Sequence, residues 1–548
     1  MAFISRLRNQ NWLFPPSIAD LIDEDHICRL VDDVVEGIDI KSIEERYDGP
    51  GSPAYHPKVM MKLLIQGTIN GFRSSRKISN ATKGNVVYMY LSDRLNPDFR
   101  TICRFRKDDL ETIKLVFAEI IKFARGMGMV KLGHLSIDGS KIKASASNFS
   151  VLSKEELDEI NKAIDMELRK GIEIDEMEDD IYGNTDPDKL PKPFKDLKER
   201  IRKDKAAKII DQYKKGDQKE KKRIEEQLDK VQNELEASGK DFVSFSDPES
   251  RFMPNKKHFT EFSYNPQVTV DAEHGIVVAE DVVQNVRDVD QLKPQIEQTE
   301  EVFGKLPKNA IVSADNDYHS AENIDFLKEH ELDGYIPHEK LASRMKGKSE
   351  TKESGRFDKD KFEYNVETDE FTCPNGEPVK FSFEYFDKQK GKQVRVYRGV
   401  GCAQCPDKKL CTKSKRKPKL IKCYGNEANM REIAEKMESP EGLEVYRVRA
   451  KTVERVFGHV KQNIGLREFL TRGLRGVRAE FSLACIAHNL KRIKMIKSQS
   501  EGIEVSPTED GRRFNQTFLK SLCGRIKMVL ANSLCSMCGS LRRKAIMG

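Results

Sequence analysis

The sequence predicts an α/β fold in which a mixed sheet is flanked by helices. Three observations predict it: short apolar stretches typical of buried strands, helical patterns between them, and two insertions of different composition. At 548 residues, the chain exceeds the roughly 250–300 residues that one hydrophobic core spans, so it divides into several units. We expect a helical region at 1–130, a core formed by 131–150, 244–340 and 440–495, a charged helical insertion at 151–243, a cysteine-rich insertion at 341–439 and a basic tail at 496–548.

Composition excludes several classes of protein. Hydrophobic residues make up 38% and charged residues 34% of the chain, a balance typical of a folded globular protein. No run of about 18 apolar residues occurs, and residues 1–16 lack the pattern of a secretory signal, so we expect no membrane partner and a cytoplasmic location. In that location thiols stay reduced, so we expect the eleven cysteines to be free thiols or metal ligands and not disulfides. The net charge of +7 allows a nucleic-acid partner without requiring one.

Short basic helices fill the N-terminal region. Pro57 suits a first helical position, and apolar residues from Val59 to Ile69 recur at helical spacing until Asn70-Gly71 breaks the pattern. The helical segments that follow resemble a helix-turn-helix module, in which one helix enters the major groove. A helical bundle with a solvated basic face explains the same pattern equally well. The cations expected to contact DNA are Arg73, Arg76, Lys77, Arg100, Arg104 and Arg106.

Apolar strands that end in acidic residues define the predicted core. A first strand leads to Asp138, and residues 267–280 read as a hairpin. A helix at 290–303 precedes a second buried strand that ends at Asp315, and a helix at 320–330 leads to a third strand at 334–337. The order strand, hairpin, helix, strand, helix, strand matches the mixed sheet of RNase H-like enzymes.

A charged insertion interrupts this series at residues 153–239, where Glu, Asp and Lys dominate and aromatic residues are few. Residues 195–237 have the helical propensity of a long charged hairpin or coiled coil. The charged insertion could be an arm that contacts DNA or a second subunit, but a solvated helical surface is the simpler interpretation.

Three carboxylates form a candidate metal site. Phosphodiester cutting by two metal ions needs several carboxylates close together, because hard cations prefer oxygen ligands. Asp138 and Asp315 each end a buried strand, although an Asp there is also a common turn former. Glu454 lies in a helix-like run at 446–464 and shares a face with Lys461, which could touch a phosphate.

Five stretches strengthen this interpretation, in fixed order: His134–Lys143, Ser246–Arg251, Tyr264–Gln267, Ser313–Tyr318, and Val453–Phe469 with its continuation His488–Arg492. With the helical region before them, they make residues 20–495 similar to bacterial insertion-sequence transposases of the DDE class. The resemblance implies an RNase H-like core with Asp138, Asp315 and Glu454 as catalytic ligands of Mg²⁺ or Mn²⁺. It also implies binding of inverted-repeat ends and target DNA, cutting and joining of strands, a homodimeric active complex, and association with the nucleoid.

A Y-R-E-K signature of related transposases has its counterpart in Tyr446, Arg449, Glu454 and Lys461, of which the resemblance implies that Tyr446, Arg449 and Lys461 contact DNA. Four residues separate Arg449 from Glu454, where the family has three, and this puts the role of Arg449 in doubt because one helical step is about 100°. Asp317 stands where the family usually has Gly, so it is an alternative to Asp315.

A cysteine cluster occupies the second insertion. Cys373, Cys402, Cys405 and Cys411 form two knuckle-like turns in basic surroundings, a pattern that favours a structural Zn²⁺. A cluster of free thiols is the alternative, and Cys423 could replace one ligand. Residues 511–548 contain no acidic residue, so this tail could hold the phosphate backbone or be a variable appendage.

Two other functions fit part of the sequence. An RNase H-like nuclease would cut without joining, and only the full-length resemblance favours transposition over it. A transposase-derived DNA-binding protein would no longer cut, and the presence of all three acidic residues argues against it.

Overall fold

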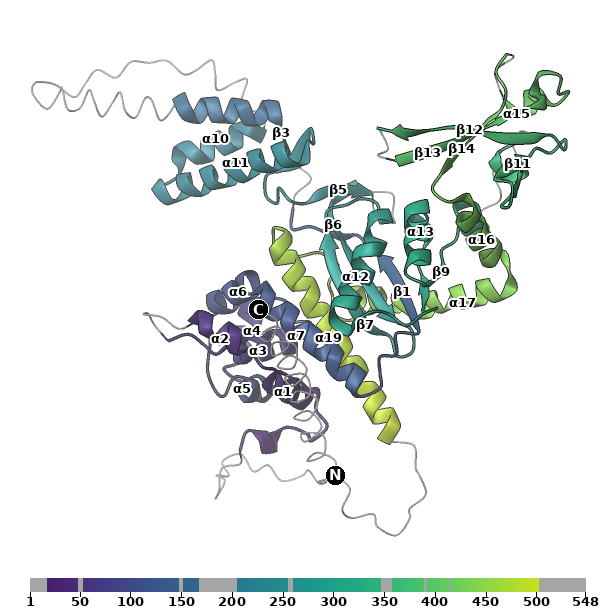
Figure 1. The fold of residues 1–548 in the computed structure, drawn as a ribbon. Coiled ribbons are helices and arrows are strands. Elements are labelled where there is room, and N and C mark those ends of the chain that lie inside the picture. The colour runs from purple at the N-terminus through teal and green to yellow at the C-terminus, as the bar shows by residue number, and fades with distance from the viewer. Residues whose placement is uncertain are drawn as a thin grey trace, which may run out of the picture.

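A mixed sheet stands at the centre of the structure, with a helical region on one side and two insertions projecting from it (Figure 1). The computed structural model describes residues 17–47, 53–146, 151–166, 205–254, 260–345, 357–388, 392–412, 414 and 416–501. In this part of the chain, no helix is both long enough and apolar enough to cross a bilayer. The predicted basic tail lies outside the described residues from position 502 onward.

The central sheet has the strand order β7–β6–β1–β8–β9. β1, β8 and β9 are parallel, whereas β6 runs antiparallel to both of its neighbours. Two short strands, β2 and β5, pair with the first half of β6. The predicted hairpin and all three predicted strands are therefore present. The strand bounds are β1 (His134–Gly139), β2 (Ile142–Lys143), β5 (Arg251–Pro254), β6 (Thr260–Asp271), β7 (Ile276–Val283), β8 (Ile311–Ser313) and β9 (Asp333–Tyr335).

Helices cover the sheet, and the described residues of the N-terminal region form helices and no strands, as predicted. α12 (Leu292–Phe303) and α13 (Ala321–Glu329) connect the strands, and α14 (Glu339–Met345) follows β9. Short 3-10 turns lie at Ala19–Leu21, Glu45–Tyr47, Val289–Gln291, Asn316–Tyr318, Lys359–Lys361 and Gly401–Ala403. The N-terminal helices are α1 (Ile27–Gly37), α2 (Lys41–Glu44), α3 (Pro57–Ile69), α4 (Ser75–Ala81), α5 (Val86–Leu91), α6 (Phe99–Asp108) and α7 (Leu110–Gly126).

The long helix α19 (Leu474–Glu501) joins these two regions. It packs against β7 on one side and against α3, α6 and α7 on the other (Figure 1). Its apolar residues are spread around the helix axis, a pattern that requires cover on every side. Ten of its residues belong to the core that the N-terminal helices and the sheet share: Val477, Ala479, Phe481, Leu483, Ala484, Cys485, Ile486, Ala487, Leu490 and Ile493.

The charged insertion forms a helical hairpin, as predicted for the residues that are described. α10 (Lys205–Lys215) and α11 (Gln218–Ser238) pack together with the helix at 154–166, and β3 (Val151–Ser153) pairs with β4 (Phe242–Ser244). Apolar residues from all of these elements form a small core of their own, separate from the main one. Residues 195–204 of the predicted hairpin lie outside the described residues.

The cysteine-rich insertion contains a five-stranded antiparallel sheet that the sequence analysis did not predict. Its strands lie in chain order: β10 (Glu363–Asn365), β11 (Glu370–Thr372), β12 (Pro378–Asp387), β13 (Lys392–Gly399) and β14 (Leu420–Tyr424). The short helix α15 (Lys408–Cys411) lies between the last two strands. α16 (Glu427–Glu438) then packs on α13 and leads into α17 (Pro440–Lys451) and α18 (Val453–Gln462).

Candidate active site

The strand register brings Asp138 and Asp315 to the same edge of the sheet. β1 and β8 are parallel neighbours, and Ser136 on β1 is paired with Ser313 on β8. Each aspartate follows its serine by two residues, so the two carboxylates leave the sheet at the same level. This is where the carboxyl ends of parallel strands meet, as the sequence predicted for these two residues.

Glu454 comes from the first turn of α18, and a break in the helix brings it to the aspartates. The sequence predicts one continuous helix at 446–464, but the chain breaks at Thr452, whose φ of −109° and ψ of −89° are not helical. α17 ends before this residue and α18 starts after it. The additional residue between Arg449 and Glu454 falls within this interruption, so the two side chains still meet.

Three hydroxyl groups tie the three carboxylate-bearing segments together. Ser136 Oγ lies 3.0 Å from Ser313 Oγ and 2.9 Å from Thr452 Oγ1, and all three residues are buried. Thr452 Oγ1 also lies 3.0 Å from the carbonyl oxygens of Val448 and Arg449, at the end of α17. Thr452 Oγ1 donates to Ser136 Oγ, and because a hydroxyl has one proton, the two carbonyl oxygens compete with Ser136 for it.

Each of these hydroxyl residues precedes one carboxylate by two positions: Ser136 before Asp138, Ser313 before Asp315, and Thr452 before Glu454. The sequence analysis missed this hydroxyl trio, although the repeated pattern of a hydroxyl residue, one apolar residue and an acid is visible in the sequence.

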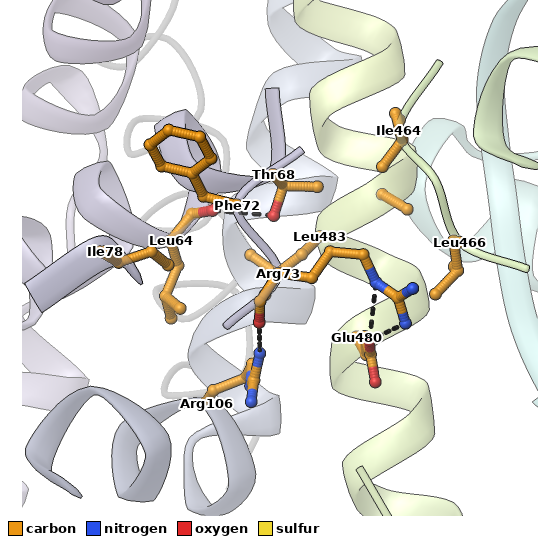
Figure 2. A pocket seen from close by; sticks show the side chains of 11 residues that line it. Leu64, Thr68, Phe72, Arg73, Ile78, Arg106, Ile464, Leu466, Glu480 and Leu483 are labelled. Atoms are coloured by element: carbon orange, nitrogen blue, oxygen red, sulfur yellow. Dashed lines mark hydrogen bonds and ion pairs between the residues drawn. The ribbon is translucent and has the colours of Figure 1, made fainter. Parts of the chain in front are cut away.

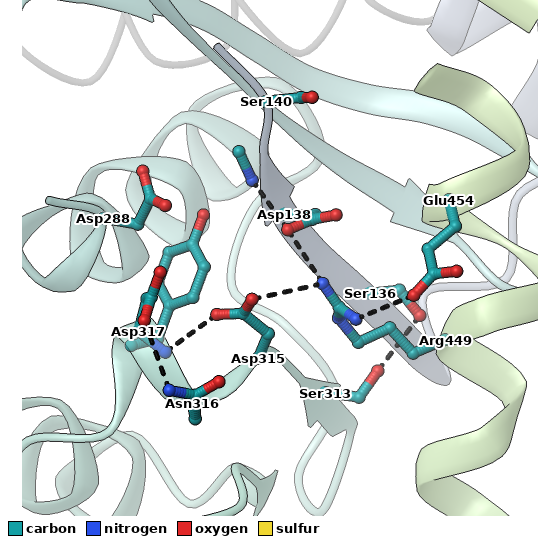
Figure 3. A network of polar contacts seen from close by, with 12 residues as sticks. Ser136, Asp138, Ser140, Asp288, Ser313, Asp315, Asn316, Asp317, Arg449 and Glu454 are labelled. Carbon is teal, nitrogen blue, oxygen red and sulfur yellow. Dashed lines mark hydrogen bonds and ion pairs between the residues drawn. The ribbon is translucent and has the colours of Figure 1, made fainter. Parts of the chain in front are cut away.

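The guanidinium of Arg449 lies between the three carboxylates (Figure 3). Its Nη2 is 2.8 Å from Asp138 Oδ1 and 4.0 Å from Asp315 Oδ2, and its Nη1 is 3.3 Å from Glu454 Oε1. Burial alone would lower the pKa of Arg449, but the surrounding acidic groups and Tyr446 outweigh that effect and raise it. One guanidinium offsets only part of the charge of three carboxylates, so the site still attracts cations.

Asp315, and not Asp317, belongs to this cluster. The Asp315 carboxylate accepts a hydrogen bond from the backbone N–H of Asp317 at 2.8 Å and caps the turn that follows β8. Asp317 is exposed and lies away from Arg449 (Figure 3). Of the two alternatives left by the sequence, the geometry favours Asp315.

Asp288 is a fourth carboxylate near this edge of the sheet, and the sequence analysis missed it. Its Oδ1 accepts hydrogen bonds from the side-chain amides of Asn265 and Gln267, and burial raises its pKa. A Cβ atom on Gly139 would lie 2.2 Å from Gln267 Nε2 and 2.8 Å from Asp288 Oδ1. Gly139 therefore leaves room for this network beside Asp138, which explains why small size matters at that position.

Donor chemistry and convergence make the three carboxylates fit a divalent cation. They come from three separate elements, they supply only oxygen atoms, and all three approach one positive group. In the described part of the chain, however, no group of three or more His, Cys, Asp or Glu side chains is spaced to hold a metal ion. In this form Arg449 compensates part of the negative charge of the site.

Lys461 and Tyr446 border the cluster on different sides. Lys461 Nζ donates to Ser140 Oγ at 2.6 Å and to the carbonyl of Lys141 at 3.1 Å, just beyond the end of β1. The ring of Tyr446 lies 6.0 Å from the guanidinium carbon of Arg449, and burial raises the pKa of its hydroxyl to about 12. The structure thus brings all four signature residues to one place.

The six N-terminal cations divide into two groups. Four are exposed on α4 and α6, with Arg76 and Arg100 on either side of the Phe99 ring: Arg76, Lys77, Arg100 and Arg104. Arg73 and Arg106 were expected to contact DNA, but they point into the interface between the N-terminal helices and α19 (Figure 2). Arg73 pairs with the buried Glu480 of α19 at 2.7 Å, and Arg106 donates to the carbonyl of Arg73 at 2.6 Å. These two arginines hold this interface together instead of facing solvent.

The stretch Ser246–Arg251 anchors the start of α19. Asp247 accepts hydrogen bonds from the Tyr264 hydroxyl at 2.8 Å and from the backbone N–H of Gly473 at 3.0 Å. Glu249 accepts one from the N–H of Leu474 at 2.5 Å. Burial raises the pKa of Asp247 to about 6. A stretch that carries the family resemblance has a structural role in this chain.

The four cysteines of the second insertion line one small cavity at the end of its sheet. Burial is the main cause that raises the pKa of the Cys411 thiol, and electrostatic interactions with Cys405, Cys402 and Cys373 add to it. Cys373 begins a tight turn closed by the N–H of Gly376, and Asn375 donates to Cys405 Sγ at 3.4 Å. Cys423 is buried on β14 and does not line this cavity.

Comparisons with known proteins match both ends of the chain. Residues 16–108 match the family described as "Transposase domain (DUF772)", and residues 372–494 match the family described as "Transposase DDE domain". The second match includes Glu454, Arg449 and Lys461, whereas Asp138 and Asp315 lie outside both. No curated protein matches. A solved structure described as a piggyBac transposase synaptic complex with hairpin DNA aligns over 93% of this chain and 82% of its own, with 9% identity and a TM-score of 0.30.

Proposed function

From the premise that the chain is an insertion-sequence transposase of the DDE class, we propose that it binds the inverted-repeat ends of its element, cuts the DNA there and joins it to a target. The proposed core is RNase H-like, with Asp138, Asp315 and Glu454 as the ligands of two Mg²⁺ or Mn²⁺ ions. The observation that carries the proposal is the convergence of these three carboxylates, from β1, the end of β8 and α18, on one guanidinium.

When bound, the divalent ions supply Lewis-acid activation of the attacking oxygen and charge stabilisation at the phosphate. The chain's own groups set the geometry around them. The hydroxyl trio fixes the relative positions of the three segments, and Arg449 offsets part of the carboxylate charge before the ions are bound. Lys461, held at the end of β1 by Ser140, supplies a positive charge for the phosphate at the cut.

The proposal is tested with linear DNA that carries the element's ends, in the presence of Mg²⁺. Asp138→Asn, Asp315→Asn and Glu454→Gln remove one charge each while keeping the side-chain shape, and each is expected to lower the cleavage rate by at least about a thousandfold. Asp317→Asn is the matched control, because it removes the same charge two residues from Asp315, and it should cut at close to the normal rate.

A gel-shift assay run beside the cleavage assay separates binding from chemistry. The three carboxylate variants should still bind the ends, since the exposed cations of α4 and α6 are unchanged. If Asp317→Asn loses cleavage and Asp315→Asn retains it, the proposed metal ligand is wrong. Cleavage without any strand joining to a target plasmid would assign the chain to the nucleases instead.

We also propose that Cys373, Cys402, Cys405 and Cys411 hold a structural Zn²⁺ ion, supported by their grouping around one cavity and by the basic side chains beside them. Protein purified without chelators should contain about one zinc per chain by elemental analysis, and the Cys402→Ser/Cys405→Ser variant should contain none. Cys28→Ser/Cys423→Ser is the control and should retain the metal. Absence of zinc from the normal protein would leave the free-thiol interpretation.

A further inference from the structure

A basic cavity lies behind the helix that carries Glu454. It has a volume of about 670 Å³ and is enclosed by α17, α18, α19 and the β6–β7 turn. Thr452, whose hydroxyl belongs to the trio under the carboxylates, also lines this cavity, and Arg455 directly follows Glu454. The cavity and the carboxylate cluster therefore share the junction between α17 and α18.

Four cations line the cavity: Lys451, Arg455, Lys491 and Arg492. Within the described part of the chain, none of them forms an ion pair. The one carboxylate in the lining, Glu273 at the rim, is paired with Lys131 at 2.5 Å. Arg492 is held toward the cavity by two hydrogen bonds to the carbonyl of His274, at 2.9 and 2.6 Å.

Two of the four cations, Lys491 and Arg492, are partly desolvated, and Arg455 repels Arg492. Burial lowers the pKa of Lys491, and both burial and the nearby Arg455 lower the pKa of Arg492. Such an arrangement is costly unless an anion compensates it. By contrast, the buried arginines nearby form ion pairs: Arg449 with Asp138, and Arg73 with Glu480.

Two histidines form the floor of the cavity and add no charge. His488 Nδ1 lies 3.1 Å from His459 Nδ1, and His488 Nε2 lies 3.0 Å from the carbonyl of Gly275. Burial lowers the pKa of His488 to about 3 and is the main cause of the lowered pKa of His459. The positive charge of the cavity thus comes from the four cations and not from the histidines.

We infer that this cavity binds phosphate groups of the DNA backbone, as a second contact separate from the carboxylate cluster. The inference rests on the proposed function for the source of the phosphate. A helix with its side chains is about 10 Å across, so a phosphate held here lies on the order of 10 Å from the cut. Measured along the axis of duplex DNA, a distance of about 10 Å spans roughly three base pairs. The cavity would fix the strand on one side of the reacting phosphate.

The test compares the full-length Arg455→Gln/Lys491→Gln variant with the normal protein. DNA affinity is measured by fluorescence anisotropy at several salt concentrations, without divalent metal. Loss of two phosphate contacts should lower the slope of log K against log salt by about 1.8 and weaken binding at least tenfold near 0.1 M salt. Lys293→Gln/Lys308→Gln removes the same charge from exposed positions 60% and 74% solvent-accessible, and should leave the slope unchanged.

A second measurement identifies the source of the phosphate. Inorganic pyrophosphate is tested for its ability to stabilise each protein against heat. If it stabilises the normal protein but not the variant, and the variant has a normal salt slope for DNA, then the cavity binds free phosphates and the inference about DNA is wrong. Unchanged affinity, slope and thermal response would also overturn it. If the Lys491 substitution impairs folding, Lys451→Gln/Arg455→Gln replaces it in the test, because both of these side chains are exposed. The same decrease in DNA affinity and salt slope is expected. A normal protein that binds with the expected slope but never cuts would refute the proposed chemistry and leave this binding site standing.

Discussion

Replacing Thr452 by Val should separate the three carboxylates without creating a cavity. Valine has nearly the same shape as threonine, so packing at this buried position is kept and only the hydroxyl is lost. That hydroxyl lies within 3.0 Å of Ser136 Oγ and of two carbonyl oxygens at the end of α17. Its removal leaves buried polar partners unsatisfied, which costs about 1–3 kcal/mol in the free energy of unfolding.

The effect on chemistry should exceed the effect on stability. Thr452 connects the α17–α18 junction to β1, and loss of this tie lets Glu454 shift relative to Asp138. Groups that orient metal ligands typically contribute about 10–100-fold to metal affinity or rate. We therefore expect the Mg²⁺ concentration for half-maximal cleavage to rise by about that factor, in an assay with saturating DNA.

Thr452→Ser is the matched control, because it keeps the hydroxyl and removes only a methyl group. It should bind Mg²⁺ and cut almost normally, while losing about 1 kcal/mol of stability. Urea unfolding measures stability in both variants. If Thr452→Val unfolds more easily but has the normal Mg²⁺ requirement and rate, the hydroxyl trio is only structural and our reasoning about the carboxylates is refuted.

Three further predictions concern cations and a buried acid. Lys461→Ala should slow cutting more than it weakens binding. By contrast, the combined variant Arg76→Gln, Arg100→Gln and Arg104→Gln should lower the salt slope of DNA binding by up to about 2.7. If Lys461→Ala and the combined variant have equal effects in cleavage and gel-shift assays, the proposed separation of cutting from binding residues is wrong. Arg73→Gln leaves the buried Glu480 without its charged partner, so it should lower the free energy of unfolding in urea by about 3 kcal/mol. The salt slope of DNA binding should stay unchanged, and a reduced slope would instead indicate that Arg73 contacts DNA. Because the pKa of Asp247 is raised to about 6 in the folded chain, its contribution to stability is present below about pH 4 and is lost as the pH rises through 6. Asp247→Asn should remove this part of the pH dependence, and identical pH profiles of the two proteins would show that Asp247 ionises normally.

Periodicity and strand-end residues were enough to predict β1, the β6–β7 hairpin, β8 and β9, but not the short strands β2 and β5 or the first half of β6. The apolar strands before Asp138 and Asp315 are parallel neighbours, and helices and hairpin follow in the predicted order. The one-residue difference before Glu454 could not be interpreted from spacing, because a helical projection assumes an unbroken helix. The non-helical backbone at Thr452 is fixed by long-range bonds to β1, which local sequence does not encode.

Three other features could not be predicted from the local sequence. Arg73 and Arg106 have the same local surroundings as their exposed neighbours, and only the approach of α19 makes them internal. The sheet of the second insertion is built from strands whose exposed face carries aromatic residues, such as Phe381 and Phe383, so its apolar and polar positions do not alternate clearly. Asp288 was missed because its amide partners lie more than 20 positions away.

The place of α19 between the N-terminal helices and the sheet has a consequence during synthesis of the chain. The helices up to Gly126 leave the ribosome long before Leu474, so their apolar surface waits for a covering helix that is made about 350 residues later. At about 5–20 residues per second, this delay is roughly 20–70 s. Until then the exposed arginines of α4 and α6 belong to an incomplete structure. A nascent or truncated chain therefore lacks the finished surface that we propose for DNA binding, and we expect DNA recognition only when nearly the whole protein has been made.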